Sequence, residues 1–261
     1  MKISCVTASY IADLVGYPGA VDWGAAGRKI IESPMLETIE GMVRRLAPAK
    51  LDGIELYYPH ISPTKLTPVL ASEIRRRLSA AGMSCAACAG GVPDPAKDPY
   101  GAEEQFQTAR LIDTRLIAGH VHVERLAPLT RLCRKYGVRL GYENGAEPDV
   151  AAILAAIQGG NKWIGANLDT GNMAAQGGDP VGAVRELGAT LIHVHLKDVP
   201  SVGSHECVAM GKGIVDIAGV LRELKRLDYD GWLSIEIETG DHDPTDEILE
   251  SADTVRRLLG N

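Results

Sequence analysis

Four short segments of the chain alternate apolar and polar positions, and each ends in polar residues just before a predicted loop. They run from Val138 to Glu143, Ile164 to Asp169, Leu191 to Lys197 and Leu233 to Glu238. Successive side chains of a strand point to opposite faces, so each segment has one apolar and one polar face. We expect the outward, apolar face to comprise Leu140, Tyr142, Ile164, Leu168, Ile192, Val194, Leu196, Ile235 and Ile237. The polar face comprises Glu143, Asp169, His195 and Glu236.

Strand-like runs and helical patterns alternate along the whole chain, which predicts parallel βαβ units. The expected strands are Ile3–Ala8, Gly53–Tyr58, Met83–Ala89, Leu116–Val121, Val138–Glu143, Ile164–Asp169, Leu191–Leu196 and Leu233–Ile237. The expected helices are Leu36–Leu46, Pro68–Ala81, Glu103–Asp113, Val123–Tyr136, Asp149–Ile157, Val181–Leu187, Ile217–Leu227 and Pro244–Leu259. This order predicts an α/β fold, a single (β/α)8 TIM barrel over residues 1–261 with its active site at the C-terminal mouth of the strands.

Three irregular stretches follow strands, and we expect them at the mouth of the barrel, where substrate-binding loops belong. They are Tyr10–Pro34, Gly90–Tyr100 and Val199–Val215. Their polar and aromatic side chains within reach of a ligand are Tyr17, Trp23, Lys29, Asp94, Lys97, His205 and Lys212.

Composition excludes several classes of function. The chain has 27 Lys plus Arg against 34 Asp plus Glu, a net charge of -7, and no long basic tract, so nucleic-acid binding is disfavoured. No apolar run approaches the length of a signal peptide or a membrane span, and we expect no membrane association. Five cysteines, an odd number, favour a reducing compartment, and we expect a cytoplasmic protein.

The four convergent polar residues favour a metal site. One carboxylate alone at a strand end is equally typical of a structural hydrogen-bond acceptor. Three carboxylates and an imidazole in one pocket, however, raise one another's pKa values unless a cation neutralises them. Three oxygen donors with one nitrogen suit Mn²⁺, Mg²⁺ or Co²⁺, and Zn²⁺ stays an alternative. We expect one Mn²⁺.

Several motifs in the second half of the chain carry a resemblance. They are Gly141-Tyr-Glu143-Asn144, Leu168-Asp169-Thr-Gly-Asn172, His193-Val-His195-Leu-Lys197-Asp198, Gly211-Lys-Gly213-Ile-Val-Asp216 and Gly231-Trp-Leu-Ser-Ile-Glu236, with a weaker match at Asp52-Gly-Ile-Glu55-Leu. The chain resembles the xylose isomerase-like TIM barrel superfamily, in its sugar phosphate isomerase/epimerase branch. The resemblance implies a divalent metal on Glu143, Asp169, His195 and Glu236, acid/base roles for Glu143 and Glu236, and a homodimer. At the position three residues after Asp169, many members have His and this chain has Asn172. Asn can donate a hydrogen bond to a substrate hydroxyl but cannot shuttle a proton.

Two glutamates at the mouth are suited to removing and returning a proton on the carbon next to a carbonyl group. Removing a proton from that carbon leaves an enediolate, which a metal stabilises as a Lewis acid. Glu143 and Glu236 come from different sides of the mouth, so one can remove the proton and the other return it. We therefore expect an isomerase or epimerase of a ketose, keto-inositol or related polyol. A dehydratase shares the first step and is the alternative, whereas an endonuclease IV-like nuclease is disfavoured by the charge and by Asn172.

Further residues are candidates for substrate contact or for orienting the ligands. They are Lys197, Asn172, His60, Glu55 and His193, with Glu238 open to either role. His120-Val-His122 has the spacing of an amidohydrolase metal pair, but the other residues of such a site are missing in order. Gly211-Lys-Gly213 lacks the pattern of a phosphate loop, although its backbone amides could contact a phosphate.

Overall fold

A computed structural model of the chain describes residues 1–19, 21–121 and 126–260. Eight parallel strands close into a barrel in the order β1 to β8, with β8 pairing back onto β1. The strands are β1 (Lys2–Val6), β2 (Gly53–Tyr57), β3 (Ser84–Ala89), β4 (Leu116–Gly119), β5 (Arg139–Glu143), β6 (Ile164–Asp169), β7 (Leu191–Leu196) and β8 (Trp232–Ile235). The predicted (β/α)8 barrel is confirmed.

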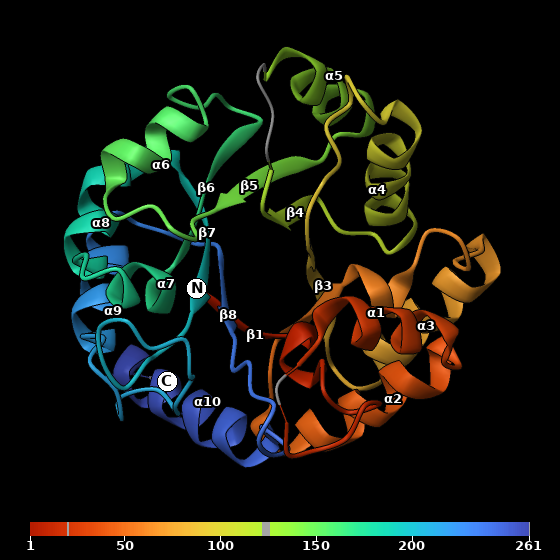
Figure 1. The fold of residues 1–261 in the computed structure, drawn as a ribbon, viewed down its shortest axis with the longest axis horizontal. Helices are drawn as coiled ribbons and strands as arrows, with labels where there is room; N and C mark the ends of the chain where they lie inside the picture. The colour runs from red at the N-terminus through yellow and green to blue at the C-terminus, as the bar shows by residue number, and fades with distance from the viewer. Residues whose placement is uncertain (20, 122–125, 261) are drawn as a thin grey trace.

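The helices surround the strands as a ring in chain order (Figure 1). They are α1 (Trp23–Glu32), α2 (Met35–Leu46), α3 (Pro68–Ala80), α4 (Pro99–Leu111), α5 (Ala127–Tyr136), α6 (Val150–Ala156), α7 (Thr170–Ala175), α8 (Pro180–Leu187), α9 (Ile217–Arg226) and α10 (Thr245–Leu259). Their apolar faces and the outward strand residues form one continuous buried cluster. None of the helices in the described part of the chain is both long and apolar enough to cross a membrane.

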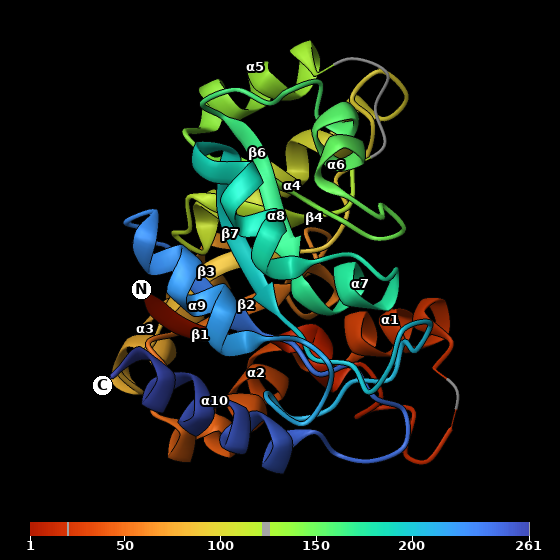
Figure 2. The ribbon, with the colours of Figure 1, turned by 90° about the vertical axis from the view of Figure 1, so that its left-hand side faces the viewer.

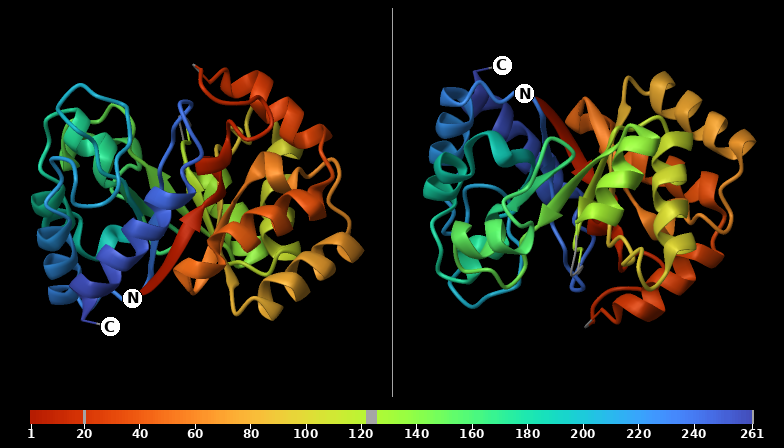
Figure 3. Two further views of the ribbon diagram at one scale, coloured as in Figure 1. Left: turned by 90° about the horizontal axis from the view of Figure 1, so that it is seen from below. Right: turned by 90° about the horizontal axis from the view of Figure 1, so that it is seen from above.

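Both termini lie at one end of the barrel, and the loops that follow the strands lie at the other (Figures 2 and 3). In Figure 2, α1, α7 and the long loop after β7 gather on the side opposite the termini. This is the end at which parallel strands finish, so side chains from all eight strand ends are brought to one face.

Some details differ from the sequence-based expectation. The stretch Tyr10–Pro34 is not irregular throughout, because α1 occupies Trp23–Glu32 with Asp22 as its N-cap. Ile192 was expected on the outer face, and this is wrong: it packs inside the barrel with Ala87, Leu116 and Ala118. A register shift between β6 and β7 turns Ile192 inward. The first residues of the predicted helix Val123–Tyr136 lie outside the described residues.

The loop after β7 is organised around one buried carboxylate. Asp198 Oδ2 accepts hydrogen bonds from the amides of Gly211 and Gly213, each 2.9 Å long, and Oδ1 accepts from Val199 and Val215, each 3.0 Å long. Gly213 has no room for a side chain, since a Cβ there would lie 2.2 Å from the carbonyl oxygen of Val199. The backbone amides of the glycine motif after β7 therefore bind the carboxylate of Asp198, a residue of the same chain.

Replacing Asp198 by Asn should lower the free energy of unfolding by roughly 3 kcal/mol, because the new NH2 group faces amide donors that it cannot bond. Urea denaturation measures this loss. Asp216→Asn is the matched control: Asp216 caps α9 through one bond to Gly219 at the exposed surface, and its loss should cost about 1 kcal/mol or less. Equal costs for the two variants would contradict the role given to Asp198.

Candidate metal centre and active site

The structure brings the four predicted ligands together at the mouth of the barrel. Glu143 ends β5, Asp169 ends β6, His195 lies in β7 and Glu236 follows β8. One donor atom from each residue lies within 4.8 Å of every other, and all four side chains are buried. The period of two in the strands thus places the four donors on the inner face of the barrel at one height.

A pocket of about 420 Å³ opens above this cluster. Its described lining consists of Ala8, Trp23, Tyr57, Ala89, Gly90, Gly91, His120, Glu143, Asn172, His195, Glu236 and Glu238. Glu143, His195 and Glu236 therefore belong both to the ligand cluster and to the pocket wall, so a molecule in this pocket would contact the cluster directly.

The imidazole of His195 lies between two glutamates. Its Nδ1 is 3.3 Å from Glu143 Oε1 and 3.2 Å from Glu236 Oε2, while Nε2 lies 3.1 Å from Glu55 Oε1. Burial opposes a charged ring, but the three carboxylates outweigh it and hold the pKa of His195 well above its usual value. The carboxylates thus stabilise a positive charge at Nδ1.

Lys197 supplies a second positive charge beside the cluster. Its Nζ lies 3.0 Å from Asp169 Oδ2, 3.1 Å from Glu236 Oε2 and 3.0 Å from Glu238 Oε2. Burial opposes ionisation of Glu236, yet Lys197 and His195 hold its pKa at about 2. For Glu238 burial dominates over the attraction of Lys197 and raises the pKa to about 7. Burial likewise raises the pKa of Asp169, against the effect of Lys197.

The residues present fit a divalent cation. Asp169 Oδ2 and Glu236 Oε2 are buried and accept no well-aligned hydrogen bond, despite their proximity to Lys197. Buried carboxylate oxygens without a hydrogen-bond donor are costly unless cations compensate them, and here the one ammonium group of Lys197 is shared by three carboxylates. Three carboxylates and one imidazole, with donor atoms this close, are a donor set of the kind that binds divalent metals.

Two asparagines hold the ends of β5 and β6 in place. The side chain of Asn144 accepts a bond from the amide of Asp169 (2.8 Å) and donates one to its carbonyl oxygen (3.1 Å). Asp169 Oδ1 caps α7 through the amide of Asn172 (2.8 Å), and Asn172 Nδ2 donates to the carbonyl oxygen of Asn144 (3.0 Å). One carboxylate oxygen of Asp169, Oδ1, therefore caps the helix, and the other, Oδ2, faces the cluster.

Beneath His195 lies a buried polar network around Glu55. Glu55 Oε2 accepts from His193 Nε2 (2.7 Å) and from the hydroxyl of Ser234 (2.5 Å), and Oε1 faces His195 Nε2. Glu55 and His193 are fully buried, and neither lines the pocket. The structure therefore places these two predicted substrate contacts behind His195, a predicted metal ligand, where they orient its ring.

His60 is buried below Tyr57 and does not line the pocket. Its Nδ1 lies 3.1 Å from Thr7 Oγ1, whose oxygen already accepts from the amide of Tyr57. The Thr7 hydroxyl keeps its own hydrogen for donation, and Nδ1 of the neutral ring is able to accept it. Burial, aided by the charge of Arg45, lowers the pKa of His60 to about 3.

This low pKa makes the fold sensitive to acid. The unfolded chain binds a proton at His60 near pH 6.5 and the folded chain only near pH 3, so stability due to neutral His60 is present above pH 6.5 and is lost as pH falls towards 3. Between pH 7 and 4.5 the wild type should lose roughly 2–3 kcal/mol more than His60→Gln. Urea denaturation at both pH values measures the difference, and parallel losses would contradict it.

Two residues of the pocket wall, Tyr57 and His120, were not predicted as parts of this site. Tyr57 lies two residues beyond Glu55 on the same face of β2, so strand alternation contains the signal. His120 follows β4, and its position directly after a strand is the only sequence signal. Its Nδ1 lies 3.1 Å from the carbonyl oxygen of Glu143. His122, its partner in the His-x-His motif, lies outside the described residues. Trp23, expected within reach, does line the pocket.

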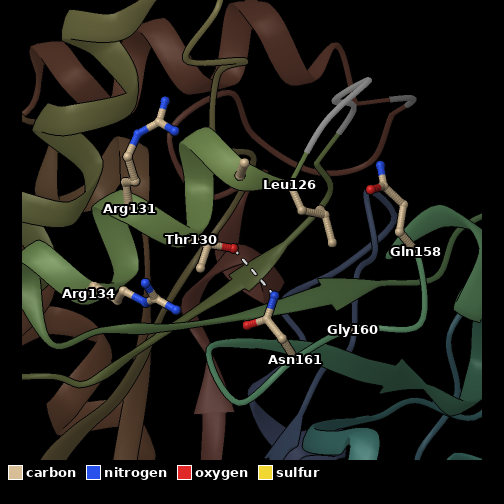
Figure 4. A pocket seen from close by; sticks show the side chains of 8 residues that line it. Leu126, Thr130, Arg131, Arg134, Gln158, Gly160 and Asn161 are labelled. Carbon is tan, nitrogen blue, oxygen red and sulfur yellow. Dashed lines mark hydrogen bonds between the residues drawn. The ribbon is translucent and has the colours of Figure 1, made fainter.

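A second hollow, of about 510 Å³, lies on the outer wall beside α5 (Figure 4). Its described lining is Leu126, Ala127, Thr130, Arg131, Arg134, Gln158, Gly160 and Asn161, with a bond of 3.3 Å from Asn161 Nδ2 to Thr130 Oγ1. This lining holds no carboxylate or imidazole. Among the described residues, the groups that could hold a metal ion lie at the mouth pocket and directly beneath it.

Comparisons with curated proteins identify partial relatives. The chain is 35% identical over 96 residues to the putative L-ribulose-5-phosphate 3-epimerase SgbU of Escherichia coli, covering 34% of this chain and 33% of that protein. It is 31% identical over 136 residues to the rhizopine catabolism protein MocC of Rhizobium meliloti, covering 44% and 41%. The aligned parts are thus less than half of these relatives' lengths.

Solved structures share the fold over the whole chain. The probable 3-DHS dehydratase AsbF from Bacillus anthracis is 16% identical with a TM-score of 0.72, covering 100% of this chain and 99% of that one. The D-psicose 3-epimerase of Clostridium cellulolyticum H10 is 15% identical with a TM-score of 0.70, covering 99% of both. The sequence model of the family described as Xylose isomerase-like TIM barrel matches residues 121–258, more than half of the chain. The chain therefore belongs to the xylose isomerase-like TIM barrel family.

Proposed function

We propose that this protein is a metal-dependent isomerase or epimerase that acts on a ketose, keto-inositol or related polyol through an enediolate. The observation that carries the proposal is the gathering of Glu143, Asp169, His195 and Glu236 within 4.8 Å of one another at the wall of the mouth pocket. Epimerases among the similar proteins and structures support it.

The four residues would hold one divalent metal, with Mn²⁺ proposed first and Mg²⁺, Co²⁺ or Zn²⁺ as alternatives. When bound, the metal supplies Lewis acidity that stabilises negative charge on substrate oxygens. Glu143 and Glu236 reach the pocket from β5 and from the end of β8, so each can face one side of a substrate carbon. One glutamate would take the proton and the other would return it.

Solvent exchange tests the proposal. Metal-loaded protein is incubated with a panel of ketoses and keto-polyols in D₂O, and NMR follows deuterium entering at carbon. We expect exchange with at least one substrate, its loss after treatment with a chelator, and its return on addition of Mn²⁺. Absence of exchange across the panel, with metal binding verified by calorimetry, would overturn the proposal.

A dehydratase is the second candidate, because elimination of a β-hydroxyl can follow the same proton removal and the similar fold of AsbF belongs to a probable dehydratase. The two functions differ in product. In the same NMR experiment an epimerase or isomerase returns a sugar of unchanged composition, whereas a dehydratase releases water and forms an enone that absorbs in the ultraviolet.

A further inference from the structure

Apart from His195 in the ligand cluster, the wall of the mouth pocket carries carboxylates but no cationic side chain among its described residues. Glu143, Glu236 and Glu238 all line it. Lys197, beside the cluster, is only 4% exposed, and its ammonium group is shared by three carboxylates at 3.0–3.1 Å. Away from the metal cluster, a phosphate or carboxylate group in this pocket would meet like charge without a cationic side chain to pair with it, which disfavours its binding.

Two further side chains present hydrogen-bond acceptors to the pocket. The carbonyl oxygen of Glu143 can only accept, so His120 Nδ1 carries the hydrogen and Nε2 of the neutral ring is an acceptor. Nε2 lies 4.0 Å from Glu143 Oε2, too far for a bond between them. Asn172 uses one hydrogen of its NH2 group to bond the carbonyl oxygen of Asn144, and its Oδ1 is an acceptor left for a ligand.

Apart from His195, the side-chain donors on the described wall are neutral. They include the indole N–H of Trp23 and the hydroxyl of Tyr57, whose rings meet edge to face with centroids 6.1 Å apart. The pair also offers apolar surface to the C–H groups of a sugar. An acceptor-rich wall with aromatic surface is complementary to a molecule with many hydroxyl groups, since each hydroxyl can donate a hydrogen bond.

Groups that could hold a phosphate are engaged or lie elsewhere. The amides of Gly211 and Gly213, the candidates from the sequence, both donate to Asp198. Arg131 and Arg134 line the hollow on the outer wall instead of the mouth (Figure 4). Away from the metal cluster, the described part of the mouth therefore offers a phosphate no cationic side chain and none of these amides.

We propose that the substrate is an uncharged, hydroxyl-rich carbonyl compound, an unphosphorylated ketose or keto-polyol, and that His120, Asn172 and Glu238 accept hydrogen bonds from its hydroxyl groups. This inference rests on the proposed function and narrows its substrate class. It excludes sugar phosphates, including the ester named for the Escherichia coli relative, and hydroxy acids.

Matched pairs of substrates test it. Mn²⁺-loaded protein is given D-fructose and D-fructose 6-phosphate, or L-ribulose and L-ribulose 5-phosphate, and carbon-bound deuterium is measured in D₂O. We expect the uncharged member of an active pair to have a kcat/KM higher by roughly 100-fold or more. Equal or faster exchange with the phosphate ester would overturn this inference and leave the proposed function standing. No exchange with either member of any ketose or keto-polyol pair would overturn both.

A second experiment tests the same inference by placing a charge on the wall of the mouth pocket. Trp23→Arg puts a guanidinium at the rim, and Trp23→Gln is the neutral control that also removes the ring. We expect Trp23→Arg to raise the ratio of kcat/KM for phosphate ester over free ketose by roughly fivefold relative to Trp23→Gln. The rise should shrink at high salt. Equal ratios in the two variants would show that charge at the wall does not select the substrate, contrary to the proposal.

Discussion

Glu143→Gln and Glu236→Gln should each lower turnover by roughly a thousandfold, because each removes one of the two groups proposed to move the proton. Both side chains line the pocket, and both lie within 3.3 Å of His195 Nδ1. Glutamine keeps the size of the side chain and one oxygen donor. The loss should therefore exceed what weaker metal binding explains, and calorimetry with Mn²⁺ measures that weakening separately.

The two variants should also differ from each other. If the glutamates face opposite sides of the substrate carbon, each variant loses deuterium exchange with the epimer whose hydrogen faced the missing base and keeps exchange with the other. NMR of both epimers in D₂O detects this complementary pattern. Glu206→Gln, which neutralises an exposed carboxylate in the loop after β7, should leave both exchanges unchanged. Exchange within about tenfold of wild type for both epimers in both variants would rule out the two-base scheme.

The ligand cluster was predictable because it depends on strand alternation and strand ends, which are local features of a sequence. A residue just before a loop, on the face opposite the apolar positions, must lie at the mouth of a parallel barrel. Glu143, Asp169 and His195 follow this rule within their strands, and Glu236 follows β8 by a single residue. The fold was predictable for the same reason, with strand ends displaced by up to two residues.

Ile192 shows where local reasoning fails. Its inward position depends on a shift of register between β6 and β7 and on space above Gly165, where a Cβ would lie 2.7 Å from the Ile192 side chain. Both conditions belong to neighbouring strands, not to the segment that contains Ile192. Alternation alone therefore placed it on the wrong face.

The helices α1 and α7 were missed for a different reason. The buried face of α1 consists of Ala26, Gly27 and Ile30, so small residues weaken the hydrophobic periodicity. α7 has six residues and begins at a cap, Asp169, that the sequence presents chiefly as a metal ligand. Short helices stabilised by capping and tertiary contact carry little pattern of their own.

The depth at which a side chain lies within the barrel could not be predicted from the sequence either. Glu55 lies in the middle of the predicted strand Gly53–Tyr58, on the polar face, and residue type alone did not separate it from the pocket wall. In the structure it is fully buried below His195, because β2 continues to Tyr57, whose ring reaches the pocket in its place. Because Glu55 is buried among hydrogen-bond donors, its replacement should cause a large loss of stability.

Glu55→Ala should lower the free energy of unfolding by roughly 3–5 kcal/mol, since it removes the common acceptor of three buried donors. These are His193 Nε2, the Ser234 hydroxyl and His195 Nε2. Burial raises the pKa of Glu55, but the two imidazoles outweigh it and hold the pKa below its usual range, so an ionised group is lost. Urea denaturation of the metal-free protein measures the loss of stability.

Glu55→Gln separates orientation of the ligand from stability. The amide keeps the volume and one acceptor but no longer fixes the His195 ring with a charged oxygen, so Mn²⁺ affinity should fall by roughly 10–100-fold in calorimetry. Ser234→Ala is the matched control, because it removes a bond to Glu55 without touching His195. It should cost about 1 kcal/mol of stability and leave Mn²⁺ affinity unchanged. If Ser234→Ala weakened Mn²⁺ binding as much as Glu55→Gln, the effect would reflect general loosening of the barrel interior, and Glu55 would have no specific part in orienting His195.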